Sequence, residues 1–178
     1  ATGGRGVFGI DLTEDGAIVA AGGDSVTLWN SVTGDLLHEI DDIGITTAVV
    51  FMPGDSVLLT GGTDGSLRMW SLDASPGLIT ELGGHNAAIT SVVTDTAGSL
   101  IVSASSDGAI KVRDSDGNEQ FAIPGIDTQG IVDVTADGRR LAIPAADGTV
   151  RVFLLDPEEL VRLAASRLTR GLTDDECR

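Results

Sequence analysis

The 178-residue sequence predicts an all-β repeat fold, in which four antiparallel sheets follow one another and a helix comes last. Three observations predict it. One pattern recurs about every 41 residues, and each copy consists of short alternating apolar runs separated by turns rich in Gly, Asp and Pro. A helical pattern appears only after residue 155.

The repeat is clearest in four segments aligned on their last residues. They read GGDSVTLW (22–29), GGTDGSLRMW (61–70), ASSDGAIKVR (104–113) and PAADGTVRVF (144–153), and their ends lie 41, 43 and 40 residues apart. Three contain Asp-Gly, where Gly tolerates the positive φ of a tight turn and Asp bonds back to turn amides. Each segment is therefore predicted to be a turn followed by a strand.

Upstream of each segment lies a β-hairpin pattern, such as VFGIDLTEDGAIVAAGG in the first copy. The first three copies also continue into a fourth short strand, whereas the last copy does not. Four antiparallel strands in about 41 residues form a β-propeller blade. We therefore expect four blades, at about residues 5–40, 41–83, 84–124 and 125–155, the last with three strands, and a helical tail at 156–178.

The tail has the signals of a helix start. Asp156 is suited to the N-cap, Pro157 to the first helical position and Glu159 to a capping box. One face would carry Leu160, Leu163, Ala164 and Leu168, and the helix is expected to end near Arg170 and Gly171. The TDDE stretch at 173–176 predicts the start of a second helix.

The charge and the cysteine content restrict the function. The net charge of -16 comes from 27 acidic and 11 basic residues, and it opposes binding to nucleic acid or to an anionic membrane. A lone Cys177 excludes an internal disulfide and favours a cytoplasmic setting. No apolar run is long enough to span a bilayer, and both ends of the sequence are interpreted as cut from a longer protein.

Motifs for catalysis or cofactors are weak. The Gly-Gly pairs at 22–23 and 61–62 precede no Lys and Ser/Thr as a phosphate loop requires, and DSDGNE (114–119) lacks the spacing of a calcium loop. His38 and His85 have no Cys or second His nearby for zinc, and no nucleophile elbow is present. We expect no enzymatic activity, no metal and no cofactor.

These residues give the chain a resemblance to WD-repeat β-propellers, over about residues 5–155. That family has a buried tetrad of Trp, Ser/Thr, Asp and His, so the resemblance implies two partial tetrads. The second blade would supply Thr60, Asp64 and Trp70, with Asp42 where the His should be. The third blade would supply His85, Ser103 and Asp107, with Arg113 in place of the Trp. The 156–178 segment also resembles the helical tails of actinobacterial WD-repeat signalling proteins, including those with a STAND-type ATPase.

The expected function is a non-enzymatic interaction module that presents loops to a protein or peptide partner, as part of a larger signalling protein. Four contact positions are predicted: His38, Thr63, Ser106 and Arg113. Arg113 could instead reach solvent or pair with Asp107 or Asp114.

Two alternative functions remain open: an enzyme or ligand receptor that uses the central channel, and a segment that only completes a ring. Because terminal blades of an open arc expose apolar faces, the arc is expected to close against the rest of its parent protein or against a second copy.

Overall fold

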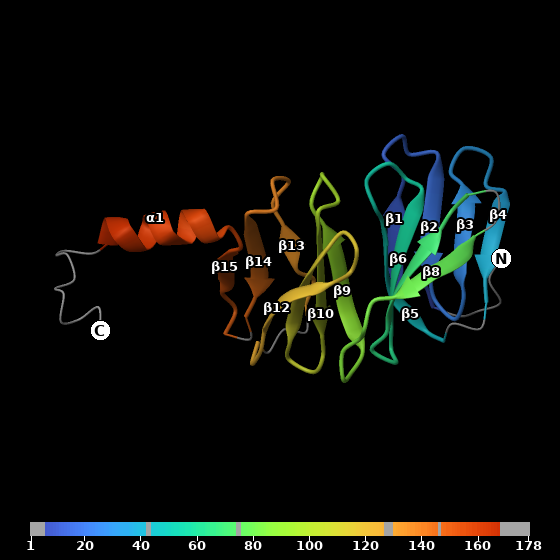
Figure 1. Ribbon diagram of the computed structural model, residues 1–178. Coiled ribbons are helices and arrows are strands. Elements are labelled where there is room, and N and C mark those ends of the chain that lie inside the picture. The colour runs from blue at the N-terminus through green and yellow to red at the C-terminus, as the bar shows by residue number, and fades with distance from the viewer. Residues whose placement is uncertain (1–5, 42–43, 74–75, 127–129, 146, 168–178) are drawn as a thin grey trace.

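The computed structural model describes residues 6–41, 44–73, 76–126, 130–145 and 147–167. They form four antiparallel sheets and one helix, which follow one another in chain order (Figure 1). Blade 1 contains β1 (Gly9–Leu12), β2 (Ile18–Gly22), β3 (Val26–Asn30) and β4 (Leu36–Ile40). Blade 2 contains β5 (Thr46–Phe51), β6 (Val57–Gly62), β7 (Leu67–Ser71) and β8 (Gly77–Glu81).

Blade 3 contains β9 (Ile89–Thr94), β10 (Leu100–Ser105), β11 (Ile110–Asp114) and β12 (Glu119–Ile123). Blade 4 contains β13 (Asp133–Val134), β14 (Arg140–Pro144) and β15 (Val150–Leu154), and the helix α1 spans Pro157–Arg167. In every sheet the strands pair in the order of the chain, as a meander. The predicted pattern of four, four, four and three strands is confirmed.

The first strands of the four sheets are neighbours, since β1 contacts β5, β5 contacts β9 and β9 contacts β13. Hydrogen bonds of the inner strands join each pair of adjacent blades. Phe51 N donates to Asp11 Oδ2 at 2.8 Å, Thr47 Oγ1 to Ile89 O at 2.5 Å, and Val132 N to Ser91 Oγ at 3.3 Å. These bonds fix each blade against the next at the inner strand.

Each pair of adjacent blades shares an apolar core. Between blades 1 and 2 it contains Ala20, Val26, Leu28, Ile40, Val49, Phe51, Leu58 and Trp70. The other two cores lie between blades 2 and 3, around Leu67 and Ile101, and between blades 3 and 4, around Val112 and Leu141. Because every internal blade is covered on both faces, its strands are apolar on both sides, which blurs the alternation expected for a half-exposed strand.

The Asp-Gly turns repeat with the same geometry. Gly65, Gly108 and Gly148 have φ values of +81°, +80° and +81°. In each turn the preceding Asp accepts from the N–H two residues further on, at 2.9, 2.9 and 3.0 Å. The predicted turn conformation is confirmed, and it explains why glycine follows the Asp in all three copies.

The helix begins where the sequence predicts. The Asp156 carboxylate accepts from the N–H of Glu158 at 2.9 Å, so it caps α1, and Pro157 opens the helix. Glu159 was expected to complete a capping box, but its carboxylate lies 2.5 Å from Arg140 of β14 and ties the helix to blade 4. The predictions for Asp42, and for Leu168, Arg170, Gly171 and 173–176, concern positions outside the described residues.

Candidate functional site: two polar clusters beneath a loop face

Blade 2 brings together two of its three expected tetrad residues. Trp70 Nε1 donates to Thr60 Oγ1 at 2.9 Å, and both side chains are buried. The expected contact of Asp64 with this pair is wrong. Its carboxylate lies in the turn, where it accepts from Ser66 N at 2.9 Å and from Arg68 Nη2 at 3.0 Å. Burial would raise the pKa of Asp64, but these hydrogen bonds outweigh it and hold the pKa below its usual value.

Blade 3 brings together all three of its expected residues. The buried imidazole of His85 has Nε2 2.9 Å from Ser103 Oγ and Nδ1 3.3 Å from Asp107 Oδ2. The contact with Ser103 is a hydrogen bond. The contact with Asp107 is electrostatic, because Nδ1 is poorly aligned with the carboxylate for a hydrogen bond. Asp107 therefore lies close to His85 but does not accept a hydrogen bond from its Nδ1.

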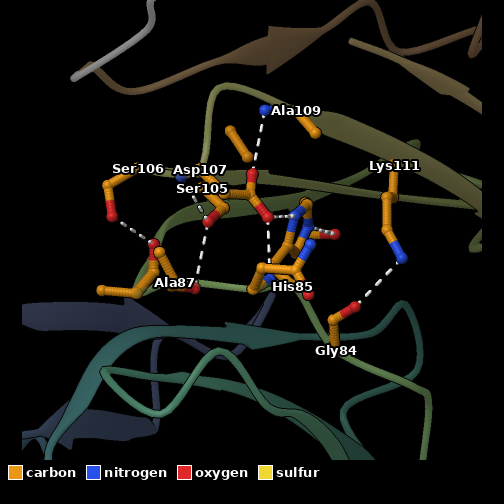
Figure 2. Close-up of polar contacts among 12 residues, drawn as sticks. Gly84, His85, Ala87, Ser105, Ser106, Asp107, Ala109 and Lys111 are labelled. Atoms are coloured by element: carbon orange, nitrogen blue, oxygen red, sulfur yellow. Dashed lines mark hydrogen bonds and ion pairs between the residues drawn. The ribbon is translucent and has the colours of Figure 1, made fainter.

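The turn at 105–109 also holds the loop that enters blade 3 (Figure 2). Asp107 Oδ2 accepts from Asn86 N at 2.8 Å, and Ser105 Oγ donates to Ala87 O at 3.0 Å. Ser106 binds Ala88 O twice, through its backbone N–H at 3.0 Å and its hydroxyl at 3.2 Å. Lys111 Nζ donates to Gly84 O at 3.0 Å. Together these bonds join residues 84–88 to residues 105–111.

Arg113 lies inside the blade, and the expectation that it reaches solvent or pairs with Asp107 or Asp114 is wrong. Its side chain is 1% exposed. Nη1 donates to Ser103 Oγ at 2.9 Å and Nη2 donates to Gly83 O at 2.6 Å, whereas Glu119 lies 4.0 Å away. A buried guanidinium cannot contact a partner while the blade is folded. The prediction of Arg113 as a contact residue is therefore also wrong.

The cluster around His85 disfavours a protonated imidazole. Burial lowers the pKa of His85 below its ordinary value, Asp107 opposes this shift, and the positive charges of Arg113 and Lys111 add to it. Burial raises the pKa of Asp107, but hydrogen bonds from the N–H groups of Asn86 and Ala109 hold it below its ordinary value. The folded blade thus favours a neutral His85 beside an ionised Asp107.

The Ser103, His85 and Asp107 side chains have the connectivity of a hydrolase triad, which the sequence order did not suggest. In a triad the serine oxygen must reach a substrate. Ser103 is 0% exposed, and its Oγ already accepts a hydrogen bond from Arg113. In this conformation the seryl oxygen can form no contact with a substrate, so the geometry serves to hold the blade together.

The acidic loop at 114–119 is also occupied by internal hydrogen bonds. The Asp114 carboxylate accepts from the N–H groups of Asp116 and Asn118 and from the amide side chains of Asn118 and Gln120. Within the described ranges, no three His, Cys, Asp or Glu side chains are placed to hold a metal ion. These hydrogen bonds give Asp114 a structural role in the turn between β11 and β12.

The end of the blades where the chain passes from one blade to the next carries the turns 23–25, 62–66 and 105–109, and we call it the connection face. Thr63 and Ser106 are exposed on it. Thr63 N donates to Ile45 O at 2.9 Å, which leaves its side chain free to face outward from a fixed backbone. His38 lies elsewhere, half-buried on the outer strand β4. The four predicted contact positions therefore do not form one site.

The connection face also contains a hollow that sequence reasoning missed. It has a volume of about 400 Å³ at blade 1, and Asp24, Glu39 and Asp41 lie in its wall. These three carboxylates come from a turn, a strand and a connection, so no local motif could have indicated them. A second hollow, of about 380 Å³, lies at the opposite end of the inner strands and is lined by several acidic side chains, including Asp11 and Asp133.

Comparison with known families agrees with this architecture. Residues 36–71 and 77–114 match the family described as WD domain, G-beta repeat. Two segments of the chain therefore match a WD40 repeat. Each matched repeat starts at the fourth strand of one sheet and ends at the third strand of the next. A WD40 repeat of this chain therefore spans two adjacent sheets.

Two curated relatives also match the chain. It is 29% identical over 170 residues to the U3 small nucleolar RNA-associated protein 12 of Saccharomyces cerevisiae, covering 84% of this chain and 18% of that protein. It is 33% identical over 85 residues to the human serine-threonine kinase receptor-associated protein, covering 47% of this chain and 24% of that protein. The chain thus spans less than a quarter of the length of either relative.

A solved structure shows the same fold. The crystal structure of the computationally designed Ika4 protein superimposes with a TM-score of 0.72 at 24% sequence identity, over 86% of this chain and 94% of that one. None of the helices among the described residues is long and apolar enough to cross a membrane.

Proposed function

We propose that the chain is a non-enzymatic protein-binding module, a propeller segment of a larger signalling protein, and that its connection face binds a basic segment of a partner. The observation that carries this proposal is the hollow of about 400 Å³ on that face, with Asp24, Glu39 and Asp41 in its wall. Rigid blades with shaped loops at their ends suit the recognition of a peptide.

Charge supports a basic partner. The net charge of -16 attracts cationic segments and repels nucleic acid and anionic membranes. Among the residues that the structure describes, Arg68 pairs with Asp64 and Glu81, and Lys111 pairs with Glu119. A cationic peptide would therefore meet carboxylates of the hollow with little local repulsion.

The wider context is part of the same proposal. The names of both relatives describe association with other macromolecules, and one of them names a kinase receptor. The helix α1 and the residues after it resemble the tails of signalling proteins, so binding at the propeller would release or assemble an upstream ATPase or regulatory domain in the cytoplasm. Thr63 and Ser106 remain the predicted contact positions on the loops, and His38 a third on the edge of blade 1.

Peptide binding tests the proposal. Fluorescent peptides of equal length, rich in Lys, in Ser or in Glu, are titrated with the protein and followed by fluorescence anisotropy. We expect only the Lys-rich peptide to bind, with an affinity that falls as salt is added. The triple variant Asp24→Asn/Glu39→Gln/Asp41→Asn should weaken binding by on the order of tenfold or more.

A matched variant separates the site from the net charge. Asp35→Asn/Asp73→Asn/Asp116→Asn removes the same charge from turns at the opposite end of the blades, outside both hollows. This variant should bind nearly as well as the wild type. Equal losses in the two triple variants would mean that only the net charge matters and would overturn the site. Unchanged affinity after replacement of Thr63, Ser106 and His38 by Ala would remove these three as contacts.

A further inference from the structure

The two ends of the arc each expose a strand of apolar side chains. On β1 of blade 1, Ile10 and Leu12 are 66% and 51% exposed. On β15 of blade 4, Val150 and Val152 are 68% and 61% exposed. The helix α1 begins at the end of blade 4 and extends away from it (Figure 1). Both valines remain exposed to solvent. Exposed apolar faces of this kind mark surfaces that bind another protein surface.

The repeat itself shows what covers such a face. Val49 and Phe51 of β5 hold the positions of Ile10 and Leu12, because Met52 N donates to Val57 O as Thr13 N donates to Ile18 O. They are only 4% and 7% exposed, since blade 1 packs on them. The first face of blade 1 is thus a surface that, one blade later, is buried against the preceding blade.

The exposed strand β15 of blade 4 corresponds to the other side of a blade junction. Val150 pairs with Pro144 and Val152 with Ala142, as Ile110 pairs with Ala104 and Val112 with Val102 in blade 3. Ile110 and Val112 are both 0% exposed, because blade 4 covers them. The exposed face of blade 4 therefore corresponds to the surface that covers a face like that of blade 1 at the internal junctions. A second copy of the chain carries both halves.

An aspartate also recurs at the same position of the first strand in blades 1 and 4. Asp133 holds in blade 4 the position that Asp11 holds in blade 1, because Thr135 N donates to Arg140 O as Thr13 N does to Ile18 O. Asp11 accepts from the N–H of Phe51 in the next blade at 2.8 Å. The counterpart of Phe51 in blade 1 is Leu12. Its N–H points away from β2, because Thr13 N points toward β2 and successive N–H groups of a strand alternate.

We propose that blade 4 of one chain packs on blade 1 of a second copy, and blade 4 of the second copy on blade 1 of the first, so that two arcs close an eight-bladed ring. In each junction Val150 and Val152 cover Ile10 and Leu12, and Asp133 accepts from the Leu12 N–H. The contact is heterologous, and such contacts form either rings or open filaments. Two arcs give eight blades, within the range of about four to eight in closed propellers, whereas three arcs would exceed it.

Sedimentation velocity and light scattering over a wide range of protein concentration test this proposal. We expect a species of twice the 18.2 kDa chain mass that persists on dilution and that added salt strengthens, because salt screens the repulsion between two chains of charge -16. A monomer at every concentration would overturn the proposal. A mass that grows beyond two chains would overturn ring closure.

Single substitutions locate the contact. Val152→Asp and Leu12→Asp each break both junctions of the ring, because each places a charge in an apolar contact that occurs twice. Either should weaken dimerisation on the order of a hundredfold or more and leave a folded monomer with a cooperative unfolding transition. The matched control is Ile79→Asp on the outer strand β8, where the side chain is 51% exposed and lies away from both ends. An equal loss in Ile79→Asp would contradict the assignment of the end faces.

Mixing the two variants tests the heterologous geometry. Val152→Asp retains an intact blade 1 face and Leu12→Asp an intact blade 4 face, so the mixture can form one of the two junctions. We expect a hetero-dimer that is weaker than the wild-type ring but stronger than either variant alone. If the mixture assembles no better than its components, the two faces do not bind each other and the proposal fails. The peptide titration does not depend on this outcome, since Asp24, Glu39 and Asp41 lie outside both end faces.

Discussion

Arg113 donates a hydrogen bond to Ser103 at 2.9 Å inside blade 3, as Trp70 donates to Thr60 at 2.9 Å inside blade 2. The two donors hold corresponding positions in the repeat, each ten residues after its acceptor. Arg113 also binds the carbonyl of Gly83, and among the residues that the structure describes its Nε finds no acceptor. A guanidinium here replaces the hydrogen bond of an indole but introduces a buried positive charge.

Arg113→Ala should lower the free energy of unfolding by about 2–4 kcal/mol, because it leaves a cavity and removes two buried hydrogen bonds. Arg113→Trp should recover most of this loss, since the indole N–H can reach Ser103 as in blade 2 and no charge is buried. Urea denaturation followed by tryptophan fluorescence and circular dichroism measures both. An Arg113→Ala protein as stable as the wild type would contradict the structural role of the guanidinium.

The stability should depend on pH through His85. Burial lowers the pKa of His85 in the folded state, so the folded protein binds fewer protons than the unfolded chain. The contribution of His85 is therefore complete above its ordinary value of about 6.5 and is lost as the pH falls through the lowered pKa of the folded state. Urea midpoints should fall between about pH 7.5 and pH 5.

Two histidine variants check this assignment. His85→Gln should flatten the decline between about pH 7.5 and pH 5, whereas His38→Gln, which leaves the cluster intact, should retain it. The carboxylates with lowered pKa, such as Asp64 and Asp107, titrate at lower pH, outside the window assigned to His85. An identical slope in wild type and His85→Gln would assign the pH dependence to another group.

Thr60→Val should destabilise blade 2 by about 1–3 kcal/mol, because it keeps the shape of the side chain but leaves the Trp70 N–H buried without an acceptor. Trp70→Phe removes the N–H instead. The double variant Thr60→Val/Trp70→Phe has no buried N–H without an acceptor. Its loss in the free energy of unfolding should therefore be smaller than the sum of the two single losses. A double-mutant cycle by urea denaturation measures the coupling, and strict additivity would show that the bond contributes nothing.

Gly65→Ala should be far more harmful than Gly16→Ala, although both glycines have positive φ. At Gly16 a Cβ meets no atom within 4 Å, so the cost is the backbone strain of about 1 kcal/mol. At Gly65 a Cβ would lie 2.8 Å from Ala87 O and closer still to His85 O, which would force apart the turn and the loop entering blade 3. We expect a loss of about 3 kcal/mol or more by urea denaturation. Equal losses at the two glycines would contradict this contact.

Much of the local structure could be predicted because its causes are local. The Asp64-Gly65 turn needs only a carboxylate and a residue that tolerates positive φ, and Asp156 caps α1 through bonds to residues two and three positions away. The pairing of Trp70 with Thr60, and of His85 with Ser103 and Asp107, was implied by the resemblance to WD-repeat propellers, and the phase of the repeat located these positions. Arg113 aligns with the aromatic residues Trp29, Trp70 and Phe153, and this alignment indicates a position inside the blade despite the charge of the side chain.

The amino-acid sequence by itself determined the number of blades, the order of their strands and the place where the helix begins, because these depend on periodicity, turn chemistry and caps within a few residues. Only the tertiary structure decided that Arg113 is buried, that the Asp64 carboxylate also binds Arg68 rather than Thr60 and Trp70, and that Asp24 meets Glu39 and Asp41 at one hollow. It also decided which apolar strands are covered. Leu12 and Phe51 are both apolar and hold corresponding positions, and only the presence of a neighbouring blade makes one a surface residue and the other part of the core.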